Sequence, residues 1–345
     1  MTAPALPRDR TVQGRERLTL AGAITRGLSA ELAADDRVVV MGEDVGRLGG
    51  VFRVTDGLQQ EFGEHRVVDT PLAESGIIGT AVGMAMRGRR PVCEIQFDGF
   101  VFPAFDQIVT QVARLHVRSG GRVRMPITIR IPYGGGIGAV EHHSESPEAY
   151  FCATPGLRVM TCSTPQDAYD AVRAAVRCDD PVILFEPKRR YWDKGDVVES
   201  VLPKSVPPTG LGEAARVLRS GTDVTLVGYG PTVRTCLDAA EAAAAEGRSI
   251  GVVELRVLAP LELDVVVAAV RTTGRLVLVS EAPQTGSLAA EIAARVTEQA
   301  FYSLEAPVLR VGGFDVPYPP SRLEELYLPD VDRVLDAVDR SLAFA

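Results

Sequence analysis

The stretch Asp69-Thr-Pro-Leu-Ala-Glu-Ser-Gly-Ile77 joins a short apolar run to a helical segment of unusual composition. The segment that follows, 76–86, consists of small and apolar residues, with Gly76, Gly79 and Gly83 spaced three to four positions apart. Each glycine lowers helix propensity by ~1 kcal/mol relative to alanine. We therefore expect another backbone or a flat ligand to lie close to this glycine face.

A single carboxylate, Glu74, stands at the entrance of this apolar helix. An acidic residue in a first turn is stabilised by the helix dipole, and this accounts for many such residues. A carboxyl group buried at this position would instead have its proton affinity adjusted for chemistry. Both interpretations of Glu74 are open at the level of the isolated stretch.

Strand-like runs alternate with helical patterns on both sides of this stretch. Short, almost continuous apolar runs of this kind are typical of parallel strands that are buried on both faces, and their alternation with helices predicts a doubly wound α/β sheet. The expected strands are 37–41, 66–68, 91–96, 126–131, 157–160 and 181–186, and the expected helices are 18–34, 55–62, 76–86, 104–118 and 165–177.

A second, smaller α/β domain is predicted after a break in this alternation. Prolines at 203, 207 and 208, together with mixed charges, indicate a linker. A length of 345 residues is also typical of two domains. The expected organisation is a flexible arm over 1–17, a first domain over 18–190, a linker over 191–213 and a second domain over 214–345. The second domain is expected to contain strands 223–228, 249–254, 275–280 and 308–311, and helices 232–246, 288–300 and 332–342.

Composition narrows the class of protein. A net charge of −8 argues against broad binding of nucleic-acid phosphates, which requires a basic face. No apolar run approaches the ~18 residues of a membrane span. The five cysteines are scattered without a C-x-x-C pair, which favours buried thiols in a reducing compartment over disulfides or zinc. The composition therefore predicts a cytoplasmic protein that binds neither nucleic acid nor membrane.

Polar residues at the carboxyl ends of the expected strands are the candidates for chemistry, since ligands of open α/β sheets bind there. Glu43, Glu74 and Gln96 occupy such positions, and a glycine-rich loop after strand 126–131 leads to the pair His142-His143. A loop histidine is commonly solvated or bonded to backbone, but its pKa near neutrality also suits acid/base catalysis. The residues alone leave these two roles for the histidine equally open.

Several ligand signatures are missing from the sequence. The chain contains neither a G-x-x-x-x-G-K-[ST] phosphate loop, nor a G-x-S-x-G elbow, nor an H-E-x-x-H helix. It also lacks a Gly-Asp-Gly followed by Asn-Asn, which binds magnesium diphosphate in thiamine diphosphate enzymes. A carboxylate and a histidine at a sheet edge without a phosphate anchor suggest half of a site.

From about residue 18 onward the chain resembles the β subunit of the first component of 2-oxo acid dehydrogenases. The resemblance implies two transketolase-like domains, an N-terminal pyrimidine-binding domain and a C-terminal domain. Among such enzymes the branched-chain (3-methyl-2-oxobutanoate) type is the most similar. The blocks that carry the resemblance are Gly42-Glu-Asp-Val-Gly46, Gly49-Gly-Val-Phe-Arg53, Asp69-Thr-Pro-Leu-Ala-Glu74, Glu94-Ile-Gln-Phe97, Phe102-Pro-Ala-Phe-Asp-Gln107, His143-Ser-Glu-Ser-Pro-Glu148, Glu186-Pro-Lys188 and Gly313-Phe-Asp-Val-Pro-Tyr318.

The resemblance implies a thiamine diphosphate cofactor that is shared with an α subunit, which would also hold the diphosphate and Mg²⁺. Glu74 matches the family glutamate that exchanges a proton with the pyrimidine ring, and His143 matches the family acid/base histidine that serves acyl transfer. The positions that match cofactor contacts are Glu43, Leu72, Ala73, Glu74, Gln96 and Phe100. The positions that match substrate contacts are Phe100, Val101, Phe102, Pro103 and His143.

Two further points follow from the resemblance. Many relatives have tyrosine where this chain has Phe100, so a hydroxyl is missing there, although the ring can still pack. The family also has a potassium-type site built largely from carbonyl groups, and it corresponds here to Ile127, Thr128, Cys178 and Asp180.

The expected activity is oxidative decarboxylation of a branched-chain 2-oxo acid, with transfer of the acyl group to a lipoyl arm. The expected partners are an α subunit, in an α2β2 heterotetramer, and a lipoylated dihydrolipoyl acyltransferase core. The alternatives are a pyruvate dehydrogenase β subunit, or a non-catalytic module whose C-terminal domain docks the acyltransferase core. One methylene in an apolar pocket discriminates by only ~1–3 kcal/mol, so few residues decide the substrate.

Overall fold

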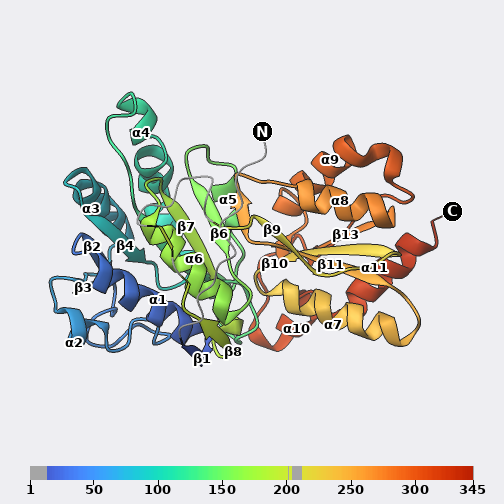
Figure 1. The fold of residues 1–345 in the computed structure, drawn as a ribbon, viewed down its shortest axis with the longest axis horizontal. Coiled ribbons are helices and arrows are strands. Elements are labelled where there is room, and N and C mark those ends of the chain that lie inside the picture. The colour runs from blue at the N-terminus through green and yellow to red at the C-terminus, as the bar shows by residue number, and fades with distance from the viewer. Residues whose placement is uncertain (1–13, 201, 204–211, 345) are drawn as a thin grey trace. The chain divides into compact units, whose positions relative to one another are not determined.

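The computed structural model describes residues 14–200, 202–203 and 212–344. Most of the expected arm over 1–17 and the central part of the expected linker over 191–213 lie outside the described residues. Contacts divide the chain into two compact units, and the segment Gly134–Ala149 groups with Ala214–Ala345 instead of with its sequence neighbours. Figure 1 shows the ribbon coloured by residue number from the N-terminus to the C-terminus.

The first unit is built on a parallel sheet with the strand order β6-β7-β5-β4-β2-β3. Strand β2 illustrates the reason, since all its residues are buried, as expected for a strand covered on both faces. The strands are β2 (Val38–Gly42), β3 (Val67–Asp69), β4 (Arg90–Glu94), β5 (Thr128–Tyr133), β6 (Arg158–Thr161) and β7 (Val182–Pro187).

Helices of the first unit cover this sheet. Helix α1 packs against α6, and helix α3 packs against β4 and η1. Thr164 caps α6 by accepting a hydrogen bond from the Asp167 amide, and Pro165 occupies the first turn, where its missing N–H costs nothing. The helices are α1 (Leu20–Ala34), α2 (Leu58–Phe62), α3 (Glu74–Met86), η1 (Asp98–Ala104), η2 (Gln107–Val112), α4 (Leu115–Arg118), α5 (Glu148–Cys152), α6 (Pro165–Arg177) and η4 (Lys188–Arg190).

Two segments of the first unit differ from the expected secondary structure. The expected helix over 104–118 is broken into the 3₁₀ helix η1, the π-helical turn η2 and the short α4. Pro103 lies inside η1 and lacks the N–H that a continuous helix needs. Residues 194–198 of the expected linker form strand β8 (Lys194–Val198), which pairs with β1 (Arg15–Thr19).

The second unit contains a sheet with the strand order β14-β13-β10-β11-β9, parallel except for β9. Helices α8 and α9 lie on one face of this sheet, and α7 and α11 lie on the other (Figure 1). The elements are η3 (Glu141–His143), β9 (Ala215–Arg219), β10 (Val224–Tyr229), α7 (Thr232–Ala245), β11 (Ile250–Leu255), β12 (Val257–Ala259), α8 (Asp264–Thr273), β13 (Leu276–Pro283), α9 (Leu288–Ala300), η6 (Phe301–Ser303), β14 (Leu309–Gly313), η7 (Ser321–Leu323), α10 (Glu324–Tyr327) and α11 (Val331–Leu342).

The predicted α/β class with two doubly wound domains is therefore confirmed. The domain boundaries at 190 and 214 stay a prediction. Helix α8 is not predicted by the sequence pattern, because its start, Asp264-Val-Val-Val, is rich in β-branched residues of low helix propensity. Burial of one apolar stripe, including Val266, Val267 and Val270, nevertheless holds this segment as a helix.

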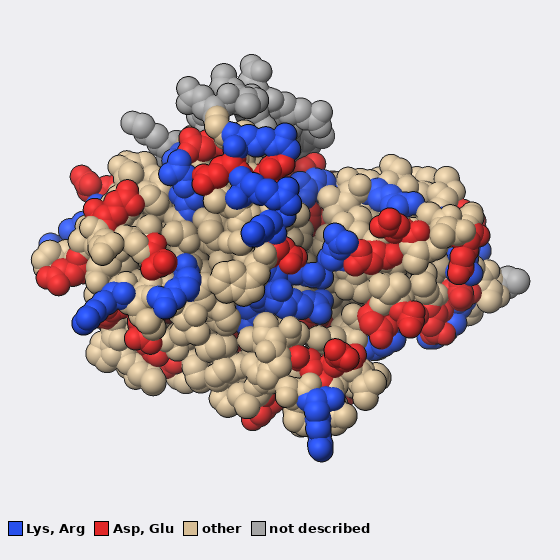
Figure 2. Space-filling view, turned by 90° about the horizontal axis from the view of Figure 1, so that it is seen from below, with Lys and Arg blue, Asp and Glu red and all other residues tan. Residues whose placement is uncertain are grey.

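The face of the molecule shown in Figure 2 carries charges of both signs. On the described part of the face in Figure 2, acidic and basic side chains lie intermixed. Among the described residues, no helix combines the length and the apolar character that a membrane crossing requires.

Candidate functional site

Three of the residues selected from the sequence follow the carboxyl ends of neighbouring strands. Glu43 comes directly after β2, Glu74 begins α3 after β3, and Gln96 lies two positions after β4. Strands β4, β2 and β3 are adjacent and parallel. The fold therefore brings these three positions to one edge of the sheet.

Glu74 is buried, with 6% of its surface exposed, although it is the first residue of α3. The negative charge of Glu74 also acts on Glu43: the pKa of Glu43 is raised by burial and then by the charges of Glu74 and Asp44. Among the described residues, neither Glu43 nor Glu74 forms an ion pair with a cationic side chain. The charge of Glu74 thus reaches a second carboxyl group at this edge, that of Glu43, and favours its protonated form.

The residues just before Glu74 face outward. Leu72 is 78% exposed, and Ala73 is exposed as well. Glu74 is thus buried at a point where the two residues before it are exposed.

The glycine face of α3 is open within this chain. Among the described residues, a β-carbon added at Gly83 would meet nothing within 4 Å, and one at Gly79 would approach only Gln107 at 3.9 Å. Packing inside the chain therefore does not require these glycines. Their propensity cost is consistent with a close neighbour that comes from outside the chain.

The loop after β2 is fixed against the ends of the neighbouring strands. The Gln96 amide donates to the Asp44 carboxylate at 3.1 Å, and Asp44 adopts a left-handed backbone with φ of 57°. The Gly46 amide donates to Asp69 at the end of β3 at 2.6 Å. These bonds hold Gln96 beside Glu43, its neighbour along the same edge.

The candidate aromatic residues lie in and beside η1. The Phe100 ring packs edge-on against Phe97, with ring centroids 6.0 Å apart. Phe102 and Pro103 are exposed, and the Phe102 ring contacts Tyr150. Val101 is fully buried, so its side chain lies in the core and not on the open surface.

His143 belongs to the second compact unit and lies in η3. Its amide donates to the Val140 carbonyl at 3.0 Å, and its ring packs edge-on against His142, with centroids 4.3 Å apart. The residue as a whole is partly exposed, although its Nδ1 atom is buried. The structure therefore places this histidine on a short turn where it can reach solvent or a ligand.

The residues of the potassium-type site lie at the opposite, amino edge of the first sheet. Thr128 begins β5, and Cys178 and Asp180 precede β7. The Cys178 carbonyl accepts a hydrogen bond from the Arg90 guanidinium at 2.6 Å, and the Ile127 carbonyl accepts one from the Val182 amide. A cation bound there would share these carbonyl oxygens with the N–H groups that already donate to them.

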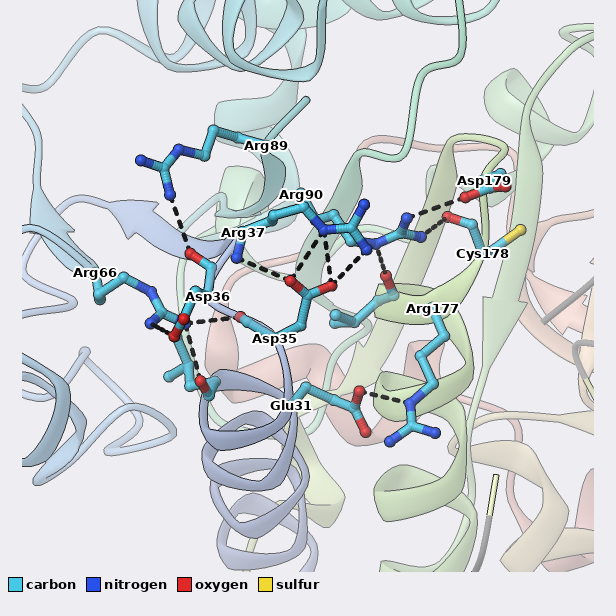
Figure 3. A network of polar contacts seen from close by, with 12 residues as sticks. Glu31, Asp35, Asp36, Arg37, Arg66, Arg89, Arg90, Arg177, Cys178 and Asp179 are labelled. Atoms are coloured by element: carbon cyan, nitrogen blue, oxygen red, sulfur yellow. Dashed lines mark hydrogen bonds and ion pairs between the residues drawn. The ribbon is translucent and has the colours of Figure 1, made fainter. Parts of the chain in front are cut away.

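Arginine–aspartate contacts surround this amino edge, as Figure 3 shows. Arg37 pairs with Asp35 at 2.8 Å, and Arg90 pairs with Asp179 at 3.0 Å. Among the described residues, no cluster of three or more His, Cys, Asp or Glu side chains could hold a metal ion.

A buried ion network lies beside the carboxyl edge of the sheet, and the sequence pattern does not predict it. Arg130, completely buried, donates to Glu94 at 2.6 Å and to both oxygens of Glu186 at 2.7 and 2.8 Å. The Tyr191 hydroxyl also donates to Glu186, at 2.7 Å, and Lys188 pairs with Asp98. The available signal was a charge inside apolar strands, since Arg130 lies between Ile129 and Ile131.

The electrostatics of this network agree with its geometry. Burial lowers the pKa of the Arg130 guanidinium, but the charges of Glu186 and Glu94 outweigh it and raise that pKa overall. Burial is also the main reason for the raised pKa of Tyr191, which therefore keeps its proton and donates to Glu186. The network holds β4, β5 and β7 together just below the loop that carries Gln96 and Phe100.

Comparisons with known proteins agree with this architecture. A model of the transketolase pyrimidine-binding domain matches residues 16–193, and a model of the transketolase C-terminal domain matches residues 213–334. A solved structure described as a split-gene transketolase, an inactive β4 tetramer, aligns with a TM-score of 0.75 at 23% identity, over 95% of this chain and 99% of that one. At that identity, the likeness concerns the fold alone.

Curated relatives cover almost the whole chain. The pyruvate dehydrogenase E1 component subunit beta of Leifsonia xyli is 58% identical, over 99% of both chains. The 3-methyl-2-oxobutanoate dehydrogenase subunit beta of Mycobacterium tuberculosis is 54% identical, over 94% of this chain and 92% of that one. The pyruvate dehydrogenase E1 component subunit beta of Bacillus subtilis is 44% identical, over 95% and 99%. The chain therefore belongs to the family of β subunits of the first component of 2-oxo acid dehydrogenases.

Proposed function

We propose that this chain is the β subunit of a 2-oxo acid dehydrogenase that decarboxylates a branched-chain 2-oxo acid and passes the acyl group to a lipoyl arm. The main support is the buried carboxyl group of Glu74, which follows the exposed Leu72 and Ala73 in the chain and whose charge raises the pKa of Glu43. A buried carboxyl group at the carboxyl edge of a sheet suits proton exchange with a bound ring.

The proposed cofactor is thiamine diphosphate. When bound, this cofactor supplies the electron sink for decarboxylation. Glu74 would hold and exchange a proton at a ring nitrogen, and Glu43 would keep a second carboxyl group beside it. Leu72, Ala73, Gln96 and Phe100 would contact the aminopyrimidine, and Phe100 can do so only by packing because it has no hydroxyl.

Partners supply what the described residues lack. We propose that an α subunit in an α2β2 assembly covers the glycine face of α3 and binds the diphosphate with Mg²⁺. His143 would transfer protons while the acyl group passes to the lipoyl arm of a dihydrolipoyl acyltransferase core. Phe102 and Pro103 would contact the substrate. Potassium at the amino edge and a cytoplasmic location also stay proposals.

Pyruvate is the second candidate substrate, and the 58% identical relative named for pyruvate dehydrogenase favours it. The blocks around Ile95, Phe102 and Ser144, in which the chain resembles the branched-chain type, favour the branched-chain acid instead. A pocket that gains about 1.4 kcal/mol from the larger side chain would discriminate roughly tenfold.

Reconstitution of the chain with a cognate α subunit, thiamine diphosphate and Mg²⁺ tests this proposal. We expect no turnover by the isolated chain, and in the assembly a kcat/KM for 3-methyl-2-oxobutanoate at least about 10-fold above that for pyruvate. The opposite ratio would assign the chain to pyruvate. Unchanged rates after His143→Ala, together with capture of the acyltransferase core, would indicate a non-catalytic docking module.

A further inference from the structure

The loop that carries His143 is held by carboxylates from the C-terminal half of the chain. Its first part runs through Gly134, Gly136 and Gly138, with φ of 81°, 88° and 70°. These left-handed conformations favour glycine. At Gly135 a β-carbon would lie 1.9 Å from the Tyr318 hydroxyl oxygen. The loop is thus shaped to bring its backbone amides directly against the residues around Tyr318.

One buried carboxylate binds two of these amides. The Gly136 amide donates to Glu324 Oε1 at 2.8 Å, and the Gly138 amide donates to Glu324 Oε2 at 2.9 Å. Glu324 is only 6% exposed, and its Oε1 also accepts from the Tyr318 hydroxyl at 2.7 Å. Hydrogen bonds to an ionised acceptor are roughly twice as strong as neutral ones. Glu324 therefore fixes both ends of the segment 136–138.

A second carboxylate and a second tyrosine complete the anchoring. The Gly135 amide donates to Glu281 Oε2 at 2.9 Å. At the far end of the loop, the Tyr229 hydroxyl donates to Glu148 Oε1 at 2.7 Å. His143 lies between these anchors on the three-residue turn η3, which is too short to be rigid by itself.

The donor state of Tyr318 agrees with this arrangement. Burial raises the pKa of Tyr318, and the hydrogen bond to Glu324 and the charges of Glu324 and Glu281 raise it further. The pKa of the neighbouring Tyr327 is raised to about 12, by burial and by the charges of Glu145, Glu281 and Asp315. Tyr318 therefore keeps its proton at neutral pH and remains a donor to Glu324.

We propose that Glu324, assisted by Glu281, is a positioning residue that holds the loop Gly134–Ala149 and thereby sets His143 for its acid/base role. This inference rests on the proposed function of His143. It adds that two glutamates, 146 and 188 positions downstream of the amides that they bind, determine where that imidazole stands. A displacement of about 1 Å in an acid/base group can cost on the order of 100-fold in rate.

Glu324→Gln in the reconstituted α/β enzyme tests the proposal, because it removes the charge while keeping the shape. We expect the rate of reductive acylation of a lipoyl domain to fall about 10-fold. Decarboxylation measured with an artificial electron acceptor should change by less than about 2-fold, because that assay bypasses the lipoyl step. Amides of loop 134–149 should exchange with deuterium faster, since two of their bonds lose the ionised acceptor.

The matched control is Glu325→Gln, the same change at the next residue, which is exposed. It should alter neither rate nor exchange. Tyr318→Phe removes one donor and should act in the same direction as Glu324→Gln, with a smaller loss; it serves as the test variant if Glu324→Gln does not fold.

Different outcomes distinguish the proposed acid/base role of His143 from the proposed positioning role of Glu324. If His143→Ala leaves lipoyl acylation unchanged, the proposed role of His143 is wrong. If His143→Ala slows acylation while Glu324→Gln, or Tyr318→Phe in its place, leaves acylation and loop exchange unchanged, the positioning role is overturned. An equal loss in both assays would also overturn it, because a general loss of structure would then explain the effect.

Discussion

Two pairs of glutamates lie near the carboxyl edge of the first sheet, and they differ in what surrounds them. Glu94 and Glu186 are both bonded to the buried Arg130. Glu43 and Glu74 lie close to each other, and among the described residues neither has a cationic partner. The same type of side chain is thus a fixed counter-ion where an arginine shares its site, and it is the group for which we propose proton exchange where no arginine does.

We therefore expect substitutions at the two pairs to change different measured quantities, the rate of turnover at one pair and the free energy of unfolding at the other. Removal of the charge at Glu74 should lower turnover, because we propose that this carboxyl group exchanges a proton during the reaction. It should not lower stability, because among the described residues no ion pair involves Glu74. Removal of Arg130 should affect folding, because it leaves two carboxylates buried without a counter-ion.

The largest expected effect is on catalysis. Glu74→Gln should lower the decarboxylation rate of the reconstituted enzyme by about 10²- to 10⁴-fold, the usual contribution of a positioned acid/base group. Its melting temperature should stay within a few degrees of the parent value, because Gln fills the same space. Steady-state kinetics of the preparation check the expected loss of rate, and thermal unfolding of the same preparation checks the expected melting temperature. Near-normal turnover would remove Glu74 from the mechanism and end the contrast between the pairs.

The next effect is on stability. Arg130→Met should lower the free energy of unfolding by about 3–5 kcal/mol, as expected when one partner of a buried ion network is removed. Urea denaturation of the isolated chain measures it. The control is Arg26→Met, which removes an exposed pair with Glu199 and should cost at most about 1 kcal/mol. Equal losses in the two variants would contradict the structural role of the Arg130 network.

The smallest effect is on pH dependence. Because the pKa of Glu43 in the fold lies above its ordinary value of 4.5, its contribution to stability is full below pH 4.5 and is lost as the pH rises through the folded-state pKa. Glu43→Gln should therefore become more stable than the parent chain at neutral pH but not at pH 4.

The same measurement in a Glu74→Gln background sharpens the comparison. The gain from Glu43→Gln should shrink there, because the charge of Glu74 is one cause of the raised pKa of Glu43. An unchanged gain would mean that burial and the charge of Asp44 account for the raised pKa of Glu43, and that Glu43 and Glu74 act independently.

Much of the fold was predictable because strand and helix periodicities are local. Helices α6 and α9 begin and end where the sequence pattern predicts, since a capping threonine and a proline start α6 and apolar spacing defines α9. Helix α8 and strand β8 were not predictable. The first is rich in β-branched residues, and the second forms only because β1 lies beside it.

The alternating α/β order, the family blocks and the positions of Glu43, Glu74 and Gln96 after strand ends can be read from the chain alone, because these features depend on short stretches of it. Which charges share a site depends instead on the folded arrangement of distant segments. The pairing of Arg130 with Glu94 and Glu186, and the binding of loop 134–149 by Glu281 and Glu324, join residues from 36 to 188 positions apart. Such contacts depend on strand order and loop path, which no local pattern encodes.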